Sequence, residues 1–212
     1  YWPEILRAKE QIDAGAIGEI ITARAAFIYA YDDYWFKEDK PWRFAASRAG
    51  GGITIDGGSH WIRPLRMWMG ELDEVVGAIA HPLKQMEGES LTRALFRFTS
   101  GKTAAFDAMM IDTVFAPDPW WRITGSKGEL TINASLDGAE LWLWDAAHPA
   151  GEKIFASPGY SESFGPELAD FAAAVLDGKT LAAGPEYALG ELRAALAIYR
   201  SVESGKWEKV WS

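Results

Sequence analysis

The middle of the chain is a succession of short strand-like runs joined by tight turns, and this pattern limits the fold more than any other feature. Turn pairs occur at Ser100-Gly101, Lys127-Gly128 and Asp137-Gly138. The runs between them are rich in β-branched and aromatic residues and cover 73–81, 91–99, 102–114, 119–125, 129–134, 139–144 and, more weakly, 152–156. Connections this short join antiparallel neighbours. The middle of the chain therefore predicts a largely antiparallel sheet.

Helical patterns lie on both sides of these runs. Pro3 suits the first turn of a short helix that ends before Gly15, and a long strand follows over 19–31. Further helices are predicted over 53–69, 162–177 and 185–204. A strand-rich middle bracketed by helices favours an α+β fold, with helices packed on one face of an open sheet. Because 212 residues are within the range of one large domain, we expect a single domain.

Apolar side chains alternate on both faces of this predicted sheet. Trp142, Trp144, Phe96 and Phe98 alternate along their strands with Leu141, Leu143, Leu95 and Arg97. Helices can cover only one of the two faces, so the other face needs a different cover. An oligomer contact is the simplest one, and we expect a homodimer or tetramer formed through the helix-free face.

Composition excludes several classes of function. The 30 acidic residues outnumber the 21 basic ones, which makes a nucleic-acid partner improbable. The chain has no cysteine, and His60, His81 and His148 lie in separate elements without paired ligand spacing, so we expect no metal site. There is no apolar run of roughly 18 to 20 residues and no leader-like start, so we expect a cytoplasmic protein without membrane contact. The chain starts at Tyr1 within a helical pattern, which suggests that a preceding segment is missing.

The stretch from residue 31 to the glycine triplet Gly50-Gly51-Gly52 is too irregular for a helix or a strand and too aromatic for a solvated linker. We interpret it as an ordered functional loop. The triplet allows close backbone approach and unusual dihedral angles at the start of the following helix, where a ligand or cofactor could enter. A merely flexible entry to the helix explains the glycines equally well.

Asp56, His60 and Arg63 follow the triplet at helical spacing i, i+4 and i+7, so a carboxylate, an imidazole and a guanidinium share one face. An imidazole titrates near neutral pH and can carry a proton, and a carboxylate one turn away can orient it. A solvated or structural Asp/His pair has the same spacing. The three residues are therefore candidates for a site, not proof of one.

Aromatic residues surround these candidates in the sequence. Trp35, Trp42 and Trp61 lie near them, together with Tyr31 and Tyr34. Flat aromatic faces suit the C–H surfaces of sugars, which makes Trp35 and Trp42 candidate substrate contacts. In a chain with 11 tryptophans, several of these rings can equally be part of the core.

Four blocks of the chain resemble the C-terminal domain of the Gfo/Idh/MocA oxidoreductases, the glucose-fructose oxidoreductase and inositol dehydrogenase family. In chain order they are AKEQIDAGAIGEIITARA, PWRFAASRAGGGITIDGGSHWIRPLRMWMG, ITGSKGELTI and ALAIYRSVESGKWEKV. The resemblance implies that Asp56 and His60 are the catalytic or substrate-contacting pair, and that Arg43 lies near the cofactor. Where the family has a substrate-side Asp, this chain has Arg63, which makes an acidic substrate plausible.

The resemblance also implies an enzyme that transfers hydride between a sugar, polyol or related hydroxy compound and NAD or NADP. No GxGxxG, GxxxxGK[ST] or GxSxG motif occurs in the chain, so we expect the nucleotide-binding Rossmann domain to lie before Tyr1. The 212 residues alone are then a substrate-binding half, inactive and without bound NAD(P). The alternative is a non-catalytic oligomerisation or carbohydrate-binding module.

Overall fold

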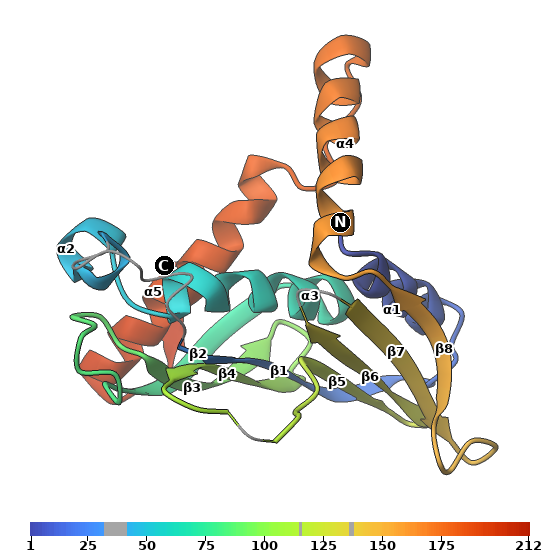
Figure 1. Ribbon diagram of the computed structural model, residues 1–212, viewed down its shortest axis with the longest axis horizontal. Helices are drawn as coiled ribbons and strands as arrows, with labels where there is room; N and C mark the ends of the chain where they lie inside the picture. The colour runs from blue at the N-terminus through green and yellow to red at the C-terminus, as the bar shows by residue number, and fades with distance from the viewer. Residues whose placement is uncertain (32–41, 115, 136–137) are drawn as a thin grey trace. The chain divides into compact units, whose positions relative to one another are not determined.

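The computed structural model describes residues 1–31, 42–114, 116–135 and 138–212 and shows an α+β fold (Figure 1). Nine strands hydrogen-bond in the order β8-β7-β6-β5-β1-β4-β3-β2-β9. The strand pairs β2/β3, β2/β9, β3/β4, β5/β6, β6/β7 and β7/β8 are all antiparallel. The predicted fold class, a largely antiparallel open sheet with helices, is confirmed. Among the described residues, no helix is long and apolar enough to span a membrane.

The elements follow the predicted order closely. The helices are α1 (Pro3–Asp13), α2 (Ala46–Ala49), α3 (Ser59–Met69), α4 (Phe164–Asp177) and α5 (Pro185–Ser204). The strands are β1 (Ile20–Ala30), β2 (Leu72–Ala80), β3 (Leu91–Phe98), β4 (Thr103–Ile111), β5 (Trp121–Gly125), β6 (Gly128–Ser135), β7 (Gly138–Asp145), β8 (Glu152–Ser157) and β9 (Glu208–Lys209). Short turns of other helix types are η1 (Trp42–Phe44), η2 (Thr54–Gly58) and η3 (Tyr160–Ser163). The sequence did not predict η1, α2 or β9.

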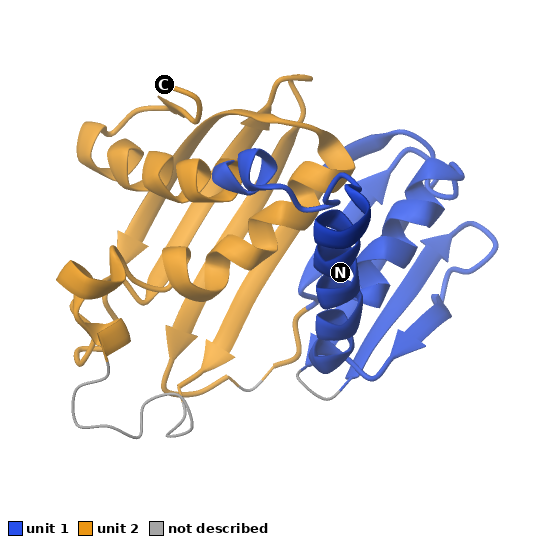
Figure 2. Cartoon of the chain, turned by 90° about the horizontal axis from the view of Figure 1, so that it is seen from above, with its two compact units in different colours: residues 1–22, 119–189 blue, residues 23–118, 190–212 orange. Residues whose placement is uncertain are grey.

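The chain forms two compact units. Unit 1 contains Tyr1–Thr22 and Pro119–Leu189, and unit 2 contains Ala23–Asp118 and Gly190–Ser212 (Figure 2). Each unit is built from two stretches that are distant in sequence.

Unit 2 packs its helices on one face of the strands β2, β3 and β4 (Figure 2). The side chains of Phe96 and Phe106 lie across the β3/β4 pair with ring centroids 5.4 Å apart and are fully buried, as are Ile62 and Leu65 of α3. On β3, Leu95 points to the other face and is 50% exposed. The alternation that predicted strand 91–99 therefore separates a core face from an open face.

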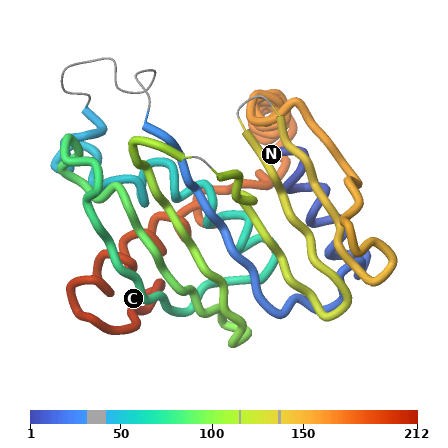
Figure 3. The backbone as a smooth tube through the Cα atoms, turned by 60° about the horizontal axis from the view of Figure 1, so that its bottom comes forward, coloured from blue at the N-terminus to red at the C-terminus, as the bar shows by residue number. Residues whose placement is uncertain are grey.

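Unit 1 contains the antiparallel run of strands β5 to β8 (Figure 3). Helix α1 packs on β7 and β8, and Leu141 of β7 is fully buried. Trp2, just before α1, packs edge-on against Trp121 with ring centroids 5.6 Å apart. An aromatic cluster therefore fastens the start of the chain to the start of β5.

Candidate functional site

The glycine triplet of unit 2 is a point of close packing. Gly50 ends α2 with φ of 82°, a left-handed conformation that favours glycine. A Cβ on Gly51 would lie 2.2 Å from the Tyr199 hydroxyl, and a Cβ on Gly52 would lie 1.9 Å from the Glu89 carbonyl oxygen. Any side chain at these two positions would collide with its neighbours. Close backbone approach, one of the two properties considered for the triplet, is therefore present, and the protein itself fills the space.

The Glu89 carboxylate occupies the start of the helical segment that follows the triplet. It accepts hydrogen bonds from the Gly52 N–H at 2.9 Å, from the Thr54 N–H at 3.0 Å and from the Tyr199 hydroxyl at 2.9 Å. Glu89 is only 3% exposed. Burial, together with the Glu89 carboxylate, raises the pKa of the Tyr199 hydroxyl above its usual range. The amides at this helix start, which elsewhere can bind an anion, are thus satisfied by an internal carboxylate.

Helix 53–69 was predicted as one α-helix, but its first turn, η2, is a π-helix. The Gly58 N–H donates to the Ile53 carbonyl five residues back, at 2.8 Å. A Cβ on Gly57 would lie 2.3 Å from the Phe27 ring, so this wider turn can lie against β1 only without a side chain there. Single π-turns at the start or inside of α-helices occur frequently at functional sites.

Asp56 lies on this π-turn and His60 on the first turn of α3, and both are exposed. The Asp56 carboxylate is 3.4 Å from the Arg43 Nε, and the Arg43 guanidinium lies 4.7 Å from the centre of the Trp42 ring. The structure therefore brings Asp56, Arg43 and Trp42 together. Within the described residues the Asp56 carboxylate pairs with Arg43 and not with His60.

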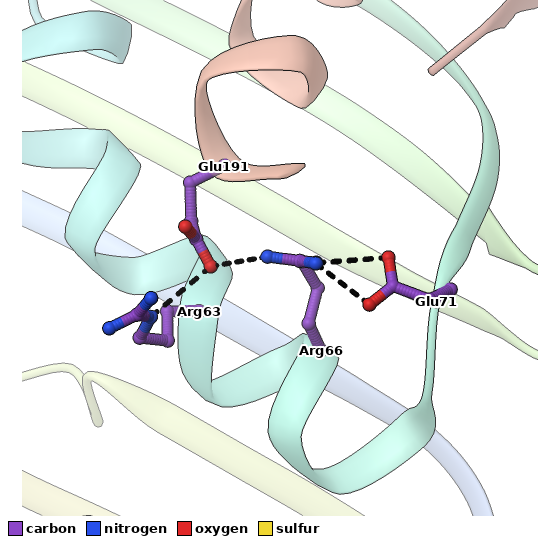
Figure 4. A network of polar contacts seen from close by, with 4 residues as sticks. All are labelled: Arg63, Arg66, Glu71 and Glu191. Carbon is purple, nitrogen blue, oxygen red and sulfur yellow. Dashed lines mark hydrogen bonds and ion pairs between the residues drawn. The ribbon is translucent and has the colours of Figure 1, made fainter. Parts of the chain in front are cut away.

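Arg63 turns toward helix α5 (Figure 4). Its Nε lies 3.3 Å from Glu191 Oε1, the same oxygen that Arg66 Nη1 contacts at 2.5 Å. Arg66 also binds Glu71 through Nη2 at 2.7 Å and is almost fully buried. A Cβ at Gly190 would lie 2.3 Å from the Arg66 guanidinium carbon, so glycine there lets the two helices approach. Arg63 thus has a structural partner, and its predicted substrate role stays a prediction.

The aromatic candidates divide between surface and core. Trp42 is 49% exposed, whereas Trp61 is 5% exposed and packs on Phe27 with ring centroids 4.5 Å apart. Trp35 lies outside the described residues. Of the tryptophans considered from the sequence, Trp42 is the one seen with an open surface next to Asp56.

Among the residues that the structure describes, no group of three His, Asp or Glu side chains is placed to hold a metal ion, and the absence of a metal site stays a prediction. His148 instead contacts two acids, Asp145 through Nδ1 at 2.9 Å and Glu152 through Nε2 at 3.0 Å. The residue that sequence reasoning missed is Glu89. It precedes β3 in an irregular segment and is separated from Gly52 by 37 positions, so no local pattern points to it.

Known proteins share the fold of this chain. A sequence model of the GFO/IDH/MocA C-terminal domain matches residues 5–131. Levoglucosan dehydrogenase of Pseudarthrobacter phenanthrenivorans is 24% identical, over 98% of this chain and 64% of its own length. A putative NADPH-dependent oxidoreductase from Desulfitobacterium hafniense superposes with a TM-score of 0.83 at 20% identity, over 99% of this chain and 62% of the other.

Levoglucosan dehydrogenase in complex with NADH and levoglucosan superposes with a TM-score of 0.78 at 23% identity, covering 99% of this chain and 64% of that enzyme. The chain therefore spans less than two thirds of each of these relatives. Since the family match covers more than half of its 212 residues, the chain belongs to the GFO/IDH/MocA family and corresponds to its C-terminal domain.

Proposed function

We propose that this chain is the substrate-binding half of an NAD(P)-dependent oxidoreductase acting on a sugar, polyol or related hydroxy compound, and that it is inactive alone. The observation that carries the proposal is the placement of Asp56 and His60. Both side chains are exposed, while the backbone just before them is held by the buried Glu89. Exposed ionisable groups on a fixed backbone are what proton transfer to a bound substrate requires.

In the proposed mechanism, His60 accepts or relays the proton of the substrate hydroxyl, because an imidazole ring has one nitrogen that can accept a proton and one that can donate it. Asp56, held beside Arg43, accepts a hydrogen bond from a substrate hydroxyl and orients it. The exposed face of Trp42 offers a surface for the C–H side of a sugar ring. When bound, NAD(P) supplies the acceptor for the hydride that leaves the carbinol carbon.

The described residues can contact one part of NAD(P) but do not form a site for the whole cofactor. Arg43 is partly exposed and can contact it, but the helix start after the glycine triplet is filled by Glu89 and cannot also hold a pyrophosphate. We therefore place the nucleotide-binding surface in a second half of the enzyme, outside these 212 residues. That location also accounts for the lack of a GxGxxG motif in this chain.

Helix α4 of unit 1 offers a surface for that second half. No residue of α4 is buried, and its large apolar side chains are strongly exposed: Phe164, Leu168, Phe171, Val175 and Leu176. Glu167, Asp170 and Asp177 give the helix three acids and no base, so two copies of α4 would repel each other. The Tyr1 hydroxyl donates a hydrogen bond to Asp170 at 2.5 Å, so residue 1 lies next to α4.

The proposed homodimer or tetramer would use the open face of the strands. In unit 2 this face carries the exposed Leu95, flanked along β3 by Arg93 and Arg97. Arg93 pairs with Asp107, and Arg97 pairs with Glu74. The face is thus more charged than the sequence suggested, and an interface there would combine ion pairs with a small apolar centre.

Steady-state kinetics of the complete enzyme, with its nucleotide-binding half restored, tests the proposal. NAD(P)H formation is followed with neutral sugars, polyols and uronates. His60→Gln is expected to lower kcat by about 10²–10⁴-fold. His148→Gln, at a histidine of unit 1 that contacts Asp145 and Glu152, serves as the matched control and should retain parent activity.

Two results would reject the proposal. One is full activity of His60→Gln, and the other is no turnover of any hydroxy compound by the parent enzyme. The second result would favour the non-catalytic oligomerisation or carbohydrate-binding module. Comparing uronate with neutral-sugar turnover in Arg63→Asp tests the remaining prediction, that Arg63 selects an anionic substrate.

A further inference from the structure

The segment just before β3 contributes a buried carboxylate to a helix that starts 37 residues earlier in the chain. The Glu89 carboxylate accepts three hydrogen bonds, from the amides of Gly52 and Thr54 and from the hydroxyl of Tyr199. Within the described residues, no Lys, Arg or His pairs with it. A Ser or Asp at the helix start would satisfy an amide locally and at low cost, whereas burying a carboxylate carries a large desolvation penalty. Glu89 therefore has an effect beyond satisfying the amides at the start of the helix.

That further effect is on the backbone that carries Asp56. The carbonyl of Gly52 accepts the Asp56 N–H at 3.2 Å, and the Thr54 hydroxyl bonds to the Thr92 hydroxyl at 2.6 Å. The two residues that donate backbone hydrogen bonds to the Glu89 carboxylate, Gly52 and Thr54, are thus the ones from which the π-turn starts. We infer that Glu89 is a positioning residue of the candidate site, which sets the place of Asp56 and, through the next turn, of His60. Its consequence for catalysis rests on the proposed function, and its geometric part does not.

Tyr199 of α5 acts on the carboxylate itself. Its hydroxyl donates a hydrogen bond to Glu89 Oε1 and accepts one from the Gly52 N–H at 3.3 Å. Tyr199→Phe removes this support and leaves both amide bonds to Glu89 possible. Glu89→Gln is more severe, because the amide nitrogen of Gln cannot accept a hydrogen bond from a backbone N–H. Glu89→Gln is therefore expected to disturb the helix start more than Tyr199→Phe does.

Hydrogen exchange of the 212-residue chain, followed by NMR, tests the geometric part. Glu89→Gln should lower the protection of the Gly52, Thr54 and Asp56 amides by about tenfold or more, the factor that one hydrogen bond is worth. Tyr199→Phe should give a smaller loss at the same amides. Ile198→Val, a fully buried change next to Tyr199, is the control for general destabilisation and should not single out these amides.

Parent-like exchange and chemical shifts from Gly52 to His60 in Glu89→Gln would overturn the inference, as would an equal and selective loss in Ile198→Val. If Glu89→Gln does not fold, Tyr199→Phe decides. A selective loss of protection at Thr54 and Asp56 then supports the inference, and parent-like protection overturns it.

The kinetic part uses the complete enzyme at a temperature where all variants are folded. Glu89→Gln should lower kcat by about 10–100-fold, because the reacting groups are misplaced, and should change the KM for NAD(P) less, because the proposed nucleotide-binding surface lies in the second half of the enzyme. Ile198→Val should keep the parent kcat, and an unchanged kcat in Glu89→Gln would overturn the catalytic role. If the parent enzyme turns over no hydroxy compound, the proposed function fails, and the exchange result still decides the geometry.

Discussion

Helices α3 and α4 have similar apolar content but opposite surroundings. In α3, seven of eleven residues are buried: Trp61, Ile62, Pro64, Leu65, Arg66, Trp68 and Met69. In α4, none of the fourteen residues is buried, and Leu176 is 81% exposed. The segment leading into α3 has its first amides bound by Glu89, while the start of α4 has no side-chain cap. An apolar stripe therefore predicts that a helix needs cover, and the described residues provide that cover for α3 only.

The α3 region is stabilised by contacts within the domain, whereas α4 is left exposed and available to a partner. The α3 region holds the candidate site and is fixed by hydrogen bonds and ion pairs to segments more than 30 positions away, Glu89 and Glu191. The α4 region exposes large apolar side chains, as interaction surfaces do, although Asp170 accepts a hydrogen bond from the distant Tyr1 hydroxyl. A rigid site and an unfilled docking helix are both expected of a domain that works with another domain.

The largest effect is expected from matched leucine truncations in the two helices. Leu65→Ala should lower the free energy of unfolding by about 3–5 kcal/mol, because Leu65 is fully buried and the change leaves a cavity. Leu168→Ala, at a position 67% exposed, should change it by less than about 0.5 kcal/mol. Urea unfolding of the 212-residue chain measures both values. A loss above about 2 kcal/mol for Leu168→Ala would mean that α4 is covered in solution and would break the comparison.

The second effect concerns the ion pairs that fasten α3 to α5. Arg66→Met should cost about 3 kcal/mol, because it removes the closer of the two arginines that contact the poorly exposed Glu191 carboxylate and leaves Arg63 beside it. Arg7→Met on α1 is the matched control, since its pair with Glu10 is exposed and is worth less than about 1 kcal/mol. Thermal and urea unfolding compare the two variants. An equal cost for both would show that the α3 network is no stronger than a surface ion pair.

The local features of this fold could be predicted from the sequence. Lys127-Gly128 marks the turn between β5 and β6, and Gly70, with φ of 93°, ends α3 as expected. Alternating apolar residues located the strands, because a pleated strand with one covered face imposes a period of two. These features depend on near neighbours along the chain.

The contacts that define the candidate site could not be predicted, because they join distant segments. Glu89 meets Gly52 across 37 positions, and Arg66 meets Glu191 across 125. The sequence pointed to Asp56, His60 and Arg63 as one helical stripe, but the π-turn alters the spacing between Asp56 and the other two. Arg63 illustrates the consequence, because its partner lies on a helix that no local pattern connects with it.

The third prediction concerns pH and the hydrogen bond from the Tyr199 hydroxyl to the Glu89 carboxylate. Burial and Glu89 raise the pKa of Tyr199 in the folded state, while an unfolded tyrosine titrates near about 10. A raised folded-state pKa gives stability that is complete below pH ~10 and is lost as the pH rises above it. The unfolding free energy of the parent should therefore fall more steeply above pH ~10 than that of Tyr199→Phe, by less than about 1.4 kcal/mol per pH unit. Equal slopes for parent and variant would show that the hydroxyl is not buried beside Glu89 in solution.

The smallest effect is expected at the hydrogen bond between Tyr1 and Asp170 of α4. The Tyr1 hydroxyl, followed by the Ala182 N–H, lowers the pKa of Asp170, so the related stability is present above an unfolded value near pH ~4 and is lost as the pH falls. Tyr1→Phe removes the larger cause and should raise the Asp170 pKa toward its usual range, without restoring it fully because Ala182 still donates. Carbon-13 NMR titration of the Asp170 carboxyl measures the change. An Asp170 pKa that is the same in Tyr1→Phe and the parent would show that the Tyr1 hydroxyl does not donate to Asp170 in solution, and α4 would then lack this contact to a distant segment.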